Sequence, residues 1–508
     1  MLIASGRQLQ RGEPPALNLL LITADQWRAE CIGAFGHPCL RTPHLDRLVQ
    51  EGLSFRHHHA QATPCGPSRA SLHTGLYALN HRSITNGTPL DARHTHLARE
   101  LRALGRTPAL FGYTDTSLDP RCYHESDPRL RSYEGVFPEW AVVQPLGEDL
   151  AGWLAWLEDL GYGRLTLGEL YGRPLGEPLK VRPEHSETAF LAGRFLRWLE
   201  RQDGTWSAHL SFIHPHPPLV AAEPFHRAVH SDDVPAPVRR PTPADAAALH
   251  PWLATQLAQP LSSGWWGKPD PRDDREMRQA RAVYFGLIMQ LDAEIGRILA
   301  ALDARGELDD TLVILTGDHG EMLGDHWLWG KNGFFRQAFH VPLVIRDPRW
   351  REVAGTEVRA FTEHVDLLPT IIERLGGEVP LAADGRSLVP WLRGETPPDW
   401  RRATHYEHDC RDVESLTFER ALGLAADRCQ LAVHQSAEIA YVHGNGLPPL
   451  AFDLVADPHQ FTNIAADPGR AADVLAAAQA MLTWRMDAAE RRLTGAKLTA
   501  QGVLGRFA

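Results

Sequence analysis

Residues 17–27 read LNLLLITADQW, a short apolar run that leads directly to an acid and an amide. The first six of these residues, LNLLLI, have the length and aliphatic content of a strand that is buried on both faces. Other runs of the same character predict further strands at 109–114, 208–213, 311–316 and 341–346. A sheet built from such strands needs cover on both sides, so the pattern predicts an α/β fold.

Amphipathic segments lie between the predicted strands, as this fold class requires. Helices are predicted over 94–104, 186–202 and 275–304. In the last of these, apolar residues recur at helical spacing and form one stripe along the helix. Strands that alternate with helices predict a parallel sheet with helices on both faces, that is, an α/β/α sandwich.

With 508 residues, the chain exceeds one ordinary hydrophobic core. We expect a large α/β domain over 1–378 and a smaller α+β unit over 379–508, which ends in a helix over 470–493. Residues 218–275 are rich in proline, tryptophan and small residues. An irregular insertion of this length inside a compact domain is typically a functional lid or an interface arm.

The net charge of −11 comes from acids and bases that are interspersed along the chain. A nucleic-acid partner would require a clustered basic face, so none is expected. The apolar run at 17–22 is too short for the core of a signal peptide and far too short to cross a membrane. We therefore expect a cytoplasmic protein without a membrane partner.

Six cysteines show no CxxC pair and no regular spacing, which indicates neither a zinc knuckle nor a disulfide framework. Cys65 is distinguished by its neighbours in QATPCGPSRASLHTG, residues 61–75. Pro67 suits the first turn of a helix, so Cys65 is expected at a helix N-terminus, where negative charge is stabilised. Arg69, one turn further on, can make a forked contact with a tetrahedral oxyanion at the same point.

Polar residues follow two of the predicted strands. Asp25 and Gln26 come after the first strand, and Asp318 and His319 come after the strand at 311–316. The crevice beyond the carboxyl ends of the strands is where open α/β sheets bind ligands. Three oxygen donors and one imidazole suit Mn²⁺, Ca²⁺ or Mg²⁺, and the imidazole favours manganese. Either motif alone fits a helix cap or an ordinary turn equally well.

The thiol of Cys65 has two simpler interpretations. It is a buried cysteine beside a surface arginine, or it is a thiolate nucleophile, which would want a histidine base nearby. A hard divalent cation gains little from thiolate. This mismatch disappears if the functional group at position 65 is an oxygen.

CGPSR matches the C-x-P-x-R signature of the sulfatases and the related phosphonate monoester hydrolases of the alkaline phosphatase superfamily, and the chain resembles this family over most of its length. The similar segments are LLLITADQWRAECIGAFGHPCLRTPHLDRLVQEGLSF, FIHPHPP, YFGLIMQLDAEIGRILAALDARGELDDTLVILTGDHGEMLGDH and PPLAFDLVADPHQFTNIAADP. The resemblance implies an alkaline-phosphatase-like sandwich with a large mixed, mostly parallel sheet and a smaller C-terminal α+β domain.

Typical sulfatases carry two adjacent acids after the first strand, whereas this chain has Asp25 and Gln26. That departure resembles the branch of phosphonate monoester hydrolases and phosphodiesterases, with promiscuity toward sulfate esters. An arylsulfatase is the alternative. A second alternative is a noncatalytic metal-binding scaffold in which Cys65 is never converted.

The resemblance implies that a formylglycine-generating enzyme oxidises Cys65 to an aldehyde whose hydrate supplies two hydroxyls on one carbon. One hydroxyl attacks phosphorus or sulfur and expels the alcohol or phenol. The second then loses its proton as the carbon returns to the aldehyde and ejects the anion. Serine is not an equivalent replacement, because it lacks the second hydroxyl.

The resemblance also implies one divalent metal ion, with Mn²⁺ expected first and Ca²⁺, Mg²⁺ or Zn²⁺ as alternatives. Its ligands would be the residue at position 65 in modified form and the four polar residues after the strands, namely Asp25, Gln26, Asp318 and His319. Arg69 would stabilise the nucleophile and the transferred group. The family further implies a homotetramer that acts on small anionic esters.

Four more residues receive roles from the resemblance. Lys331 in WGKNG and His216 in PHPP would neutralise charge on the nonbridging or leaving oxygen, and either is a candidate proton donor. Asn86 and Tyr113 would contact the substrate. Each also has a purely structural interpretation: a solvated lysine, a core histidine bonded to backbone, a turn former and a packed aromatic ring, respectively.

Overall fold

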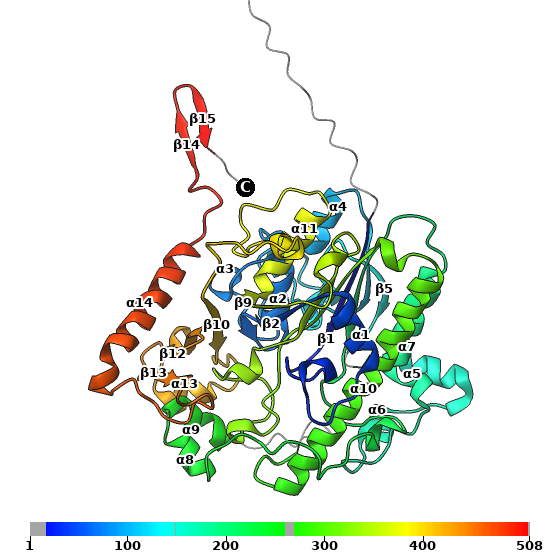
Figure 1. Cartoon of the computed structure of the whole chain (residues 1–508), viewed down its shortest axis with the longest axis horizontal. Helices are drawn as coiled ribbons and strands as arrows, with labels where there is room; N and C mark the ends of the chain where they lie inside the picture. Colours follow the sequence, from blue (N-terminus) through cyan, green and yellow to red (C-terminus); the bar gives the residue numbers. More distant parts are fainter. Residues whose placement is uncertain (1–16, 148, 260–268, 506–508) are drawn as a thin grey trace, which may run out of the picture.

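The computed structural model describes residues 17–147, 149–259 and 269–505. Its centre is an eight-stranded sheet with the strand order β5-β4-β6-β1-β7-β8-β2-β9 (Figure 1). The strands are β1 (Asn18–Ala24), β2 (Leu53–His59), β4 (Pro108–Gly112), β5 (Ala141–Pro145), β6 (Ser207–Phe212), β7 (Thr311–Gly317), β8 (Leu343–Arg346) and β9 (Glu357–Glu363). All neighbouring pairs are parallel except those that β8 makes with β7 and with β2.

All five strands expected from the sequence are present, as β1, β4, β6, β7 and β8. The fold class is therefore confirmed as α/β with a large mixed, mostly parallel sheet. The antiparallel direction of β8 could not be read from its apolar run, because direction depends on the path of the chain around it. The strands that were not predicted, β2, β5 and β9, are polar or lie at the edges of the sheet.

Both faces of the sheet are covered by hydrophobic cores, and the alternation along β1 shows why. Leu20 and Ile22 point into one core, which includes α1 (Pro43–Glu51), α7 (Glu187–Leu199) and α10 (Asp274–Ala304). Leu19 and Leu21 point into the other core, which includes α4 (Leu97–Ala103) and α11 (Leu367–Arg374). Successive side chains of a strand face opposite ways, so a continuous apolar run fits a strand buried on both sides.

The three helices expected between the strands are α4, α7 and α10. The apolar stripe of α10 is buried as expected. The remaining helices of the described residues are α2 (Cys65–Thr74), α3 (Ala78–His81), α5 (Ala151–Leu157), α6 (Leu167–Tyr171), α8 (Pro243–Ala247), α9 (Pro251–Ala258), α12 (Val389–Leu392), α13 (Thr417–Leu422) and α14 (Ala471–Asp487). Among the described residues, none of the helices combines the length and the apolar character needed to cross a membrane.

A second, five-stranded sheet lies toward the C-terminus. Its order is β13-β12-β11-β10-β3, with β10 (Ala403–Asp409), β11 (Gln430–Ser436), β12 (Ile439–Gly444) and β13 (Leu450–Asp453). Its edge strand β3 (Ala62–Thr63) pairs in parallel with β10 and comes from the segment directly before Cys65. The smaller sheet thus holds the chain immediately upstream of the predicted nucleophile. The domain boundary near residue 378 stays a prediction.

Helix α14 packs on β11 and β12, and the chain continues into a hairpin of β14 (Ala496–Thr499) and β15 (Gly502–Gly505) that stands away from the body (Figure 1). The expected terminal helix over 470–493 is therefore present as α14. The insertion over 218–275 contains α8 and α9. Its tryptophan-rich part, within 260–268, lies outside the described residues.

Candidate active site

The predicted site residues meet at the carboxyl ends of two neighbouring strands. In the parallel pairing of β1 with β7, Ala24 lies opposite Gly317, so the residues that follow them, Asp25 and Asp318, are side by side. Cys65 is the first residue of α2. Ligand atoms of Asp25, Cys65, Asp318 and His319 all lie within 4.8 Å of one another, and all four residues are buried. The sequence-based expectation that these residues converge is confirmed.

The side chain of Cys65 is 4% exposed and is surrounded by polar atoms. Its sulfur lies 3.1 Å from Nζ of Lys331, 3.3 Å from Nε2 of His319 and 3.8 Å from Oδ1 of Asp25. Burial raises the pKa of the Cys65 thiol, and the nearby charge of Asp25 raises it further. The unmodified residue is thus a neutral thiol at neutral pH, which disfavours the thiolate nucleophile as an alternative.

Arg69 lies one turn along α2 and joins the two carboxylates. Its Nη2 donates to Asp25 at 3.1 Å and its Nε donates to Asp318 at 3.0 Å. Nη1 donates to Oγ of Ser211 at 2.6 Å. A planar guanidinium can make these contacts at the same time, because its donors point in fixed directions. Arg69 therefore sets the spacing between Asp25 and Asp318, and it lies on the same helix as Cys65.

The two carboxyl groups influence each other strongly. Burial, together with the nearby charge of Asp25, raises the pKa of Asp318 to about 8. Burial also acts to raise the pKa of Asp25, but its interactions with His216, Lys331, His319 and Arg69 hold it well below its usual value. Two carboxylates this close compete for the available positive charge. A divalent cation between them would stabilise both in the ionised form, so the donor set fits a metal site.

His319 presents the correct nitrogen for such a site. Its Nδ1 lies 2.9 Å from the carbonyl oxygen of Gly320. A carbonyl only accepts, so Nδ1 carries the proton and Nε2 turns its lone pair toward Cys65 and the carboxylates. Burial lowers the pKa of His319 well below its ordinary value, and the charge of Lys331 lowers it further. A neutral imidazole is the form that binds metals.

Gln26 follows Asp25 with a positive φ of 66°. Its amide oxygen accepts from Nζ of Lys331 at 2.9 Å, and its amide nitrogen donates to Glu321. Its backbone N–H donates to Asp318 at 2.9 Å. The predicted role of Gln26 as a metal ligand stays a prediction, while its contacts already tie Lys331 to the first strand.

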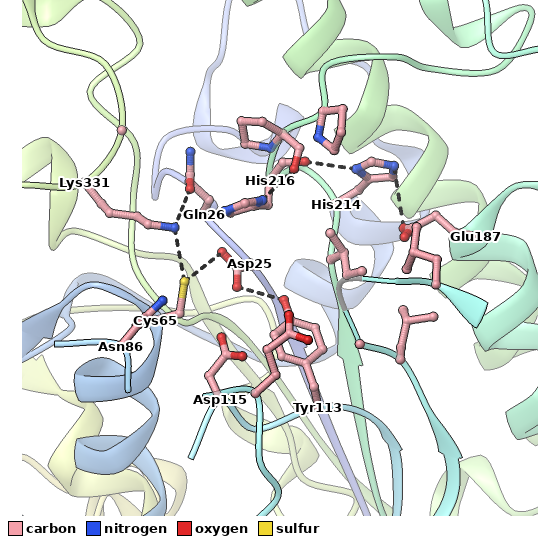
Figure 2. A pocket seen from close by; sticks show the side chains of 18 of the residues that line it. Asp25, Gln26, Cys65, Asn86, Tyr113, Asp115, Glu187, His214, His216 and Lys331 are labelled. Carbon is pink, nitrogen blue, oxygen red and sulfur yellow. Dashed lines mark hydrogen bonds and ion pairs between the residues drawn. The ribbon is translucent and has the colours of Figure 1, made fainter. Parts of the chain in front are cut away.

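A cavity of about 370 Å³ opens over these residues (Figure 2). The four residues given substrate or charge-neutralising roles by the family resemblance all line this cavity, namely Asn86, Tyr113, His216 and Lys331. Tyr113 donates from its hydroxyl to Oδ2 of Asp25 at 2.8 Å. Asn86 accepts from the backbone N–H of Gly66 at 2.9 Å and so supports the first turn of α2. Their predicted roles toward a substrate stay predictions.

Several residues of the cavity were not predicted from the sequence. Asp115 lines it and lies 3.8 Å from Nε of Arg69. Burial raises the pKa of Asp115 to about 7, although Arg69 opposes this shift. One signal was available, because Asp115 lies in the loop that begins directly after β4, two residues beyond Tyr113. For Glu187 and His214, which also line the cavity, the local sequence carries no such signal.

The sequence matches two known family models and a characterised relative. The family model named Sulfatase matches residues 17–377, and the model described as N-sulphoglucosamine sulphohydrolase, C-terminal, matches residues 324–487. The multifunctional alkaline phosphatase superfamily protein PehA of Trinickia caryophylli is 42% identical, over 96% of this chain and 99% of that protein.

Two solved structures are similar over nearly the whole chain. The phosphonate monoester hydrolase of Agrobacterium radiobacter superposes with a TM-score of 0.93 at 42% identity, and the alignment covers 97% of this chain and all of that chain (100%). The phosphonate monoester hydrolase of Silicibacter pomeroyi gives a TM-score of 0.91 at 39% identity, with coverage of 96% and 99%.

Proposed function

The chain belongs to the sulfatase family of the alkaline phosphatase superfamily and is a hydrolase of that family, and from this premise we propose that it cleaves phosphonate monoesters and phosphate diesters. The observation that carries the proposal is the meeting of Asp25, Cys65, Asp318 and His319 at one buried point beneath an open cavity. Full-length similarity to two phosphonate monoester hydrolases supports this choice of substrate over a sulfate ester.

The nucleophile in this proposal is the hydrated formylglycine made from Cys65. Position 65 is the first residue of α2, where the free N–H groups of the helix favour negative charge. Asp25, Gln26, Asp318, His319 and the modified residue would hold one divalent cation, with Mn²⁺ proposed. When bound, that cation supplies a positive charge that acidifies a neighbouring hydroxyl and attracts the anionic substrate.

Besides the cation, two side chains of the protein, Arg69 and Lys331, place positive charge at the site. Burial alone would lower the pKa of Lys331, but the nearby carboxyl groups of Asp25 and Asp318 raise it above its usual value, so the ammonium stays charged at neutral pH. It lies 3.1 Å from the sulfur of Cys65, where it would face the nonbridging oxygens of a substrate at the nucleophile. Arg69 keeps the two carboxylates in place and would stabilise the transferred group.

The leaving oxygen needs a proton, and two side chains are candidates to supply it. Nδ1 of His216 lies 2.6 Å from the carbonyl of Pro217 and therefore holds the proton of the neutral ring. Burial, with the charge of Lys331, lowers the pKa of His216 to about 3, so the ring is neutral at neutral pH. Lys331 keeps its protons at that pH, so we propose Lys331 as the donor and His216 as a partner that orients the leaving group.

Phosphonate monoesters, phosphate diesters and sulfate monoesters all carry one negative charge on a tetrahedral centre at neutral pH. Charge alone therefore gives little discrimination among them, and we propose side activity toward sulfate esters. Discrimination would come from the fourth substituent, which is a carbon or alkoxy group in the phosphorus esters and an oxygen in the sulfate. Asn86 and Tyr113, which line the cavity beside Cys65, are proposed to contact the substrate.

Turnover of three esters of one phenol tests this function. The phosphonate monoester, the phosphate diester and the sulfate monoester of the same phenol share one leaving group. Differences in kcat/KM among them therefore report the enzyme's preference for the transferred group. We expect the two phosphorus esters to react faster than the sulfate. A wide preference for the sulfate would contradict the proposal and identify an arylsulfatase.

Mass spectrometry of the peptide that contains position 65 separates the enzyme from a noncatalytic scaffold. We expect an aldehyde or its hydrate when the chain is produced together with a formylglycine-generating enzyme, and one divalent metal per chain by elemental analysis. A plain thiol in every such preparation would contradict the proposed nucleophile. The same analysis of Cys65→Ala gives the matched unmodifiable control.

Three further properties are proposed. A formylglycine-generating enzyme is the expected partner during maturation, and the mature protein is expected to act in the cytoplasm on small anionic esters. The assembly is proposed to be a homotetramer. Apolar side chains on α14 and on the β14–β15 hairpin are exposed and offer contacts for it, among them Leu482, Met486, Leu498 and Leu504.

A further inference from the structure

The active-site cavity extends beyond the predicted catalytic residues to a second polar cluster. Glu187 and His214 line the same cavity as Cys65. In Figure 2, Cys65 and Lys331 lie on one side of the view and Glu187 lies on the other, with His214 next to it. A molecule that fills the cavity would therefore meet one polar group at each end.

Glu187 is the first residue of α7 and is 1% exposed. Its Oε1 accepts from the hydroxyl of Thr188 at 3.3 Å and lies 3.6 Å from Nε2 of His214. Its Oε2 is buried and has no hydrogen-bond partner among the described residues. A buried carboxylate oxygen without a donor is costly, so its presence in a ligand cavity points to a group that binds there.

The surroundings of Glu187 favour a positively charged group. Ser186 caps α7, and the N-terminus of this helix stabilises the carboxylate form of Glu187. Two further acids line the same cavity, Glu134 and, on the side of Cys65, Asp115 (Figure 2). Burial raises the pKa of Glu187, although His214 opposes the shift. A cation beside Oε2 would supply the missing donor and neutralise the buried charge at the same time.

The segment that carries His214 also joins this cluster to the catalytic centre. His214 and His216 follow β6 within the sequence IHPHPP, and Nδ1 of His214 donates to the carbonyl oxygen of His216 at 3.2 Å. This bond fixes the ring of His214, whose Nε2 then faces Glu187. The rest of the cavity wall is largely apolar, with Leu146, Leu150, Leu167, Ile213, Pro217 and Trp329 among its residues.

We propose that Glu187, which lies beside His214, binds an ammonium group at the far end of the alcohol that the substrate releases. This inference rests on the proposed function and narrows its substrates to esters of amino alcohols. The alcohol would place its oxygen at the catalytic centre, its carbon chain along the apolar wall and its ammonium at Oε2. A cavity of about 370 Å³ is large enough for such a molecule.

Binding of free alcohols tests the inference without catalysis. By calorimetry, we expect an amino alcohol to bind the wild type about tenfold or more tightly than the alcohol of equal length that ends in a methyl group. Glu187→Gln keeps the shape but removes the charge, so this preference should fall close to one. Glu184→Gln changes an exposed residue just before α7 and should keep the preference for the amino alcohol. Equal binding of both alcohols by the wild type would overturn the inference.

A third probe separates a charged group from a neutral one. The matching diol, with a hydroxyl at the far end, should bind the wild type more weakly than the amino alcohol. If the diol binds best, and Glu187→Gln keeps that preference, the cluster recognises a hydroxyl and the ammonium assignment is wrong. Because each result is a ratio measured on one preparation, a partly unfolded variant does not distort it, and a thermal melt of each variant confirms folding.

Turnover then distinguishes this inference from the proposed function. The phosphate diesters of the amino alcohol and of its methyl-ended counterpart are compared in wild type, Glu187→Gln and Glu184→Gln. Hydrolysis of both esters at equal kcat/KM would rule out the ammonium site and would still agree with the proposed function. The opposite outcome is that the amino alcohol binds preferentially through Glu187 but neither ester is hydrolysed. That outcome would support the ammonium site and contradict the proposed function.

Discussion

The ammonium group of Lys331 lies 3.1 Å from the sulfur of Cys65, although the two residues are 266 positions apart in the chain. The same ammonium group donates to the amide oxygen of Gln26 at 2.9 Å. One positive charge is thereby fixed beside the expected nucleophile and also tied to the end of β1. This contact makes Lys331 the most informative residue for testing how the site works.

Replacing Lys331 with methionine should lower kcat/KM for the phosphonate ester by about 100- to 1,000-fold, as removal of one preorganised charge at a transition state typically does. In this variant no ammonium group stabilises the negative charge that develops on the oxygens of the transferred group. The steady-state kinetics of Lys331→Met and of Lys180→Met, which changes an exposed lysine, give the comparison. A loss of less than about threefold for Lys331→Met would place Lys331 outside the chemistry.

Replacing Arg69 with lysine keeps the charge but cannot preserve contacts to both Asp25 and Asp318. We expect a fall in kcat/KM of about 100-fold and a loss of roughly 2 kcal/mol in the free energy of unfolding, the value of a charged hydrogen bond in a buried site. Arg131→Lys, at an exposed position, serves as the control. Unchanged stability of the Arg69 variant in urea titrations would show that the guanidinium contacts contribute little.

Two glycines in helices should respond in opposite ways to replacement by alanine. In α10, a Cβ on Gly286 would lie 2.1 Å from the backbone oxygen of Phe225, so Gly286→Ala should destabilise the protein by roughly 2 kcal/mol. In α7, a Cβ on Gly193 would meet only the end of Arg297, at 3.9 Å. Gly193→Ala should therefore gain about 0.5–1 kcal/mol from helix propensity. Urea unfolding measures both, and a stabilising Gly286→Ala would contradict the close packing.

The buried pair His405 and His434 should make the protein sensitive to acid. Their ring nitrogens lie 2.8 Å apart. Burial lowers the pKa of His434 to about 4, and burial together with His434 lowers the pKa of His405 well below its usual value. The unfolded chain takes up protons near pH 6.5 while the folded pair does not. Stability is therefore fully present above about pH 6.5 and is lost as the pH falls toward 4.

Replacing His434 with glutamine removes one of these groups, so the loss of stability between pH 7 and pH 5 should shrink by about 2 kcal/mol. Urea unfolding at both pH values measures it, with a chelator present so that release of metal ions does not contribute. His124→Gln, at an exposed histidine, should leave the loss unchanged. An equal loss in wild type and His434→Gln would rule out this pair as the cause.

The C-terminal hairpin should be required for assembly. Leu498 is 81% exposed, and Val503 and Leu504 are also exposed on the same hairpin. Replacing all three with serine should convert the expected tetramer into smaller species, because burial of such side chains is what stabilises contacts between subunits. Light scattering after size-exclusion chromatography gives the mass. Val413→Ser, which changes an exposed valine elsewhere, is the control; a monomeric wild type would contradict the assembly itself.

The parts of the fold that the sequence predicted are those where one segment determines its own structure. The run before Asp25 and the run before Asp318 are buried on both faces, so their composition alone indicates central strands. Neighbouring parallel strands end at the same edge, and this placed both acids at one point. Cys65 was correctly predicted at a helix N-terminus, because Pro67 marks the first turn of that helix.

The parts that were missed depend on distant segments. The reversed direction of β8 and the pairing of β3 with β10 arise from the path of the chain, which no local pattern records. Glu187 reads as an ordinary residue at the start of a helix, and His214 as part of a proline-rich turn. They become a pair only after α7 packs against β6, which leads to His214, so only the structure could reveal their place in the cavity.

The pairing of β3 with β10 sets an order of events during synthesis of the chain. Residues 62–63 leave the ribosome long before 403–409, so the segment around Cys65 stays without its sheet partner for most of translation. In the folded chain, Cys65 is buried at the start of α2, beside Asp25 and His319 at the strand ends. If Cys65 is converted as we propose, the oxidising enzyme must reach it in this interval, and a chain that folds early would remain inactive for its lifetime.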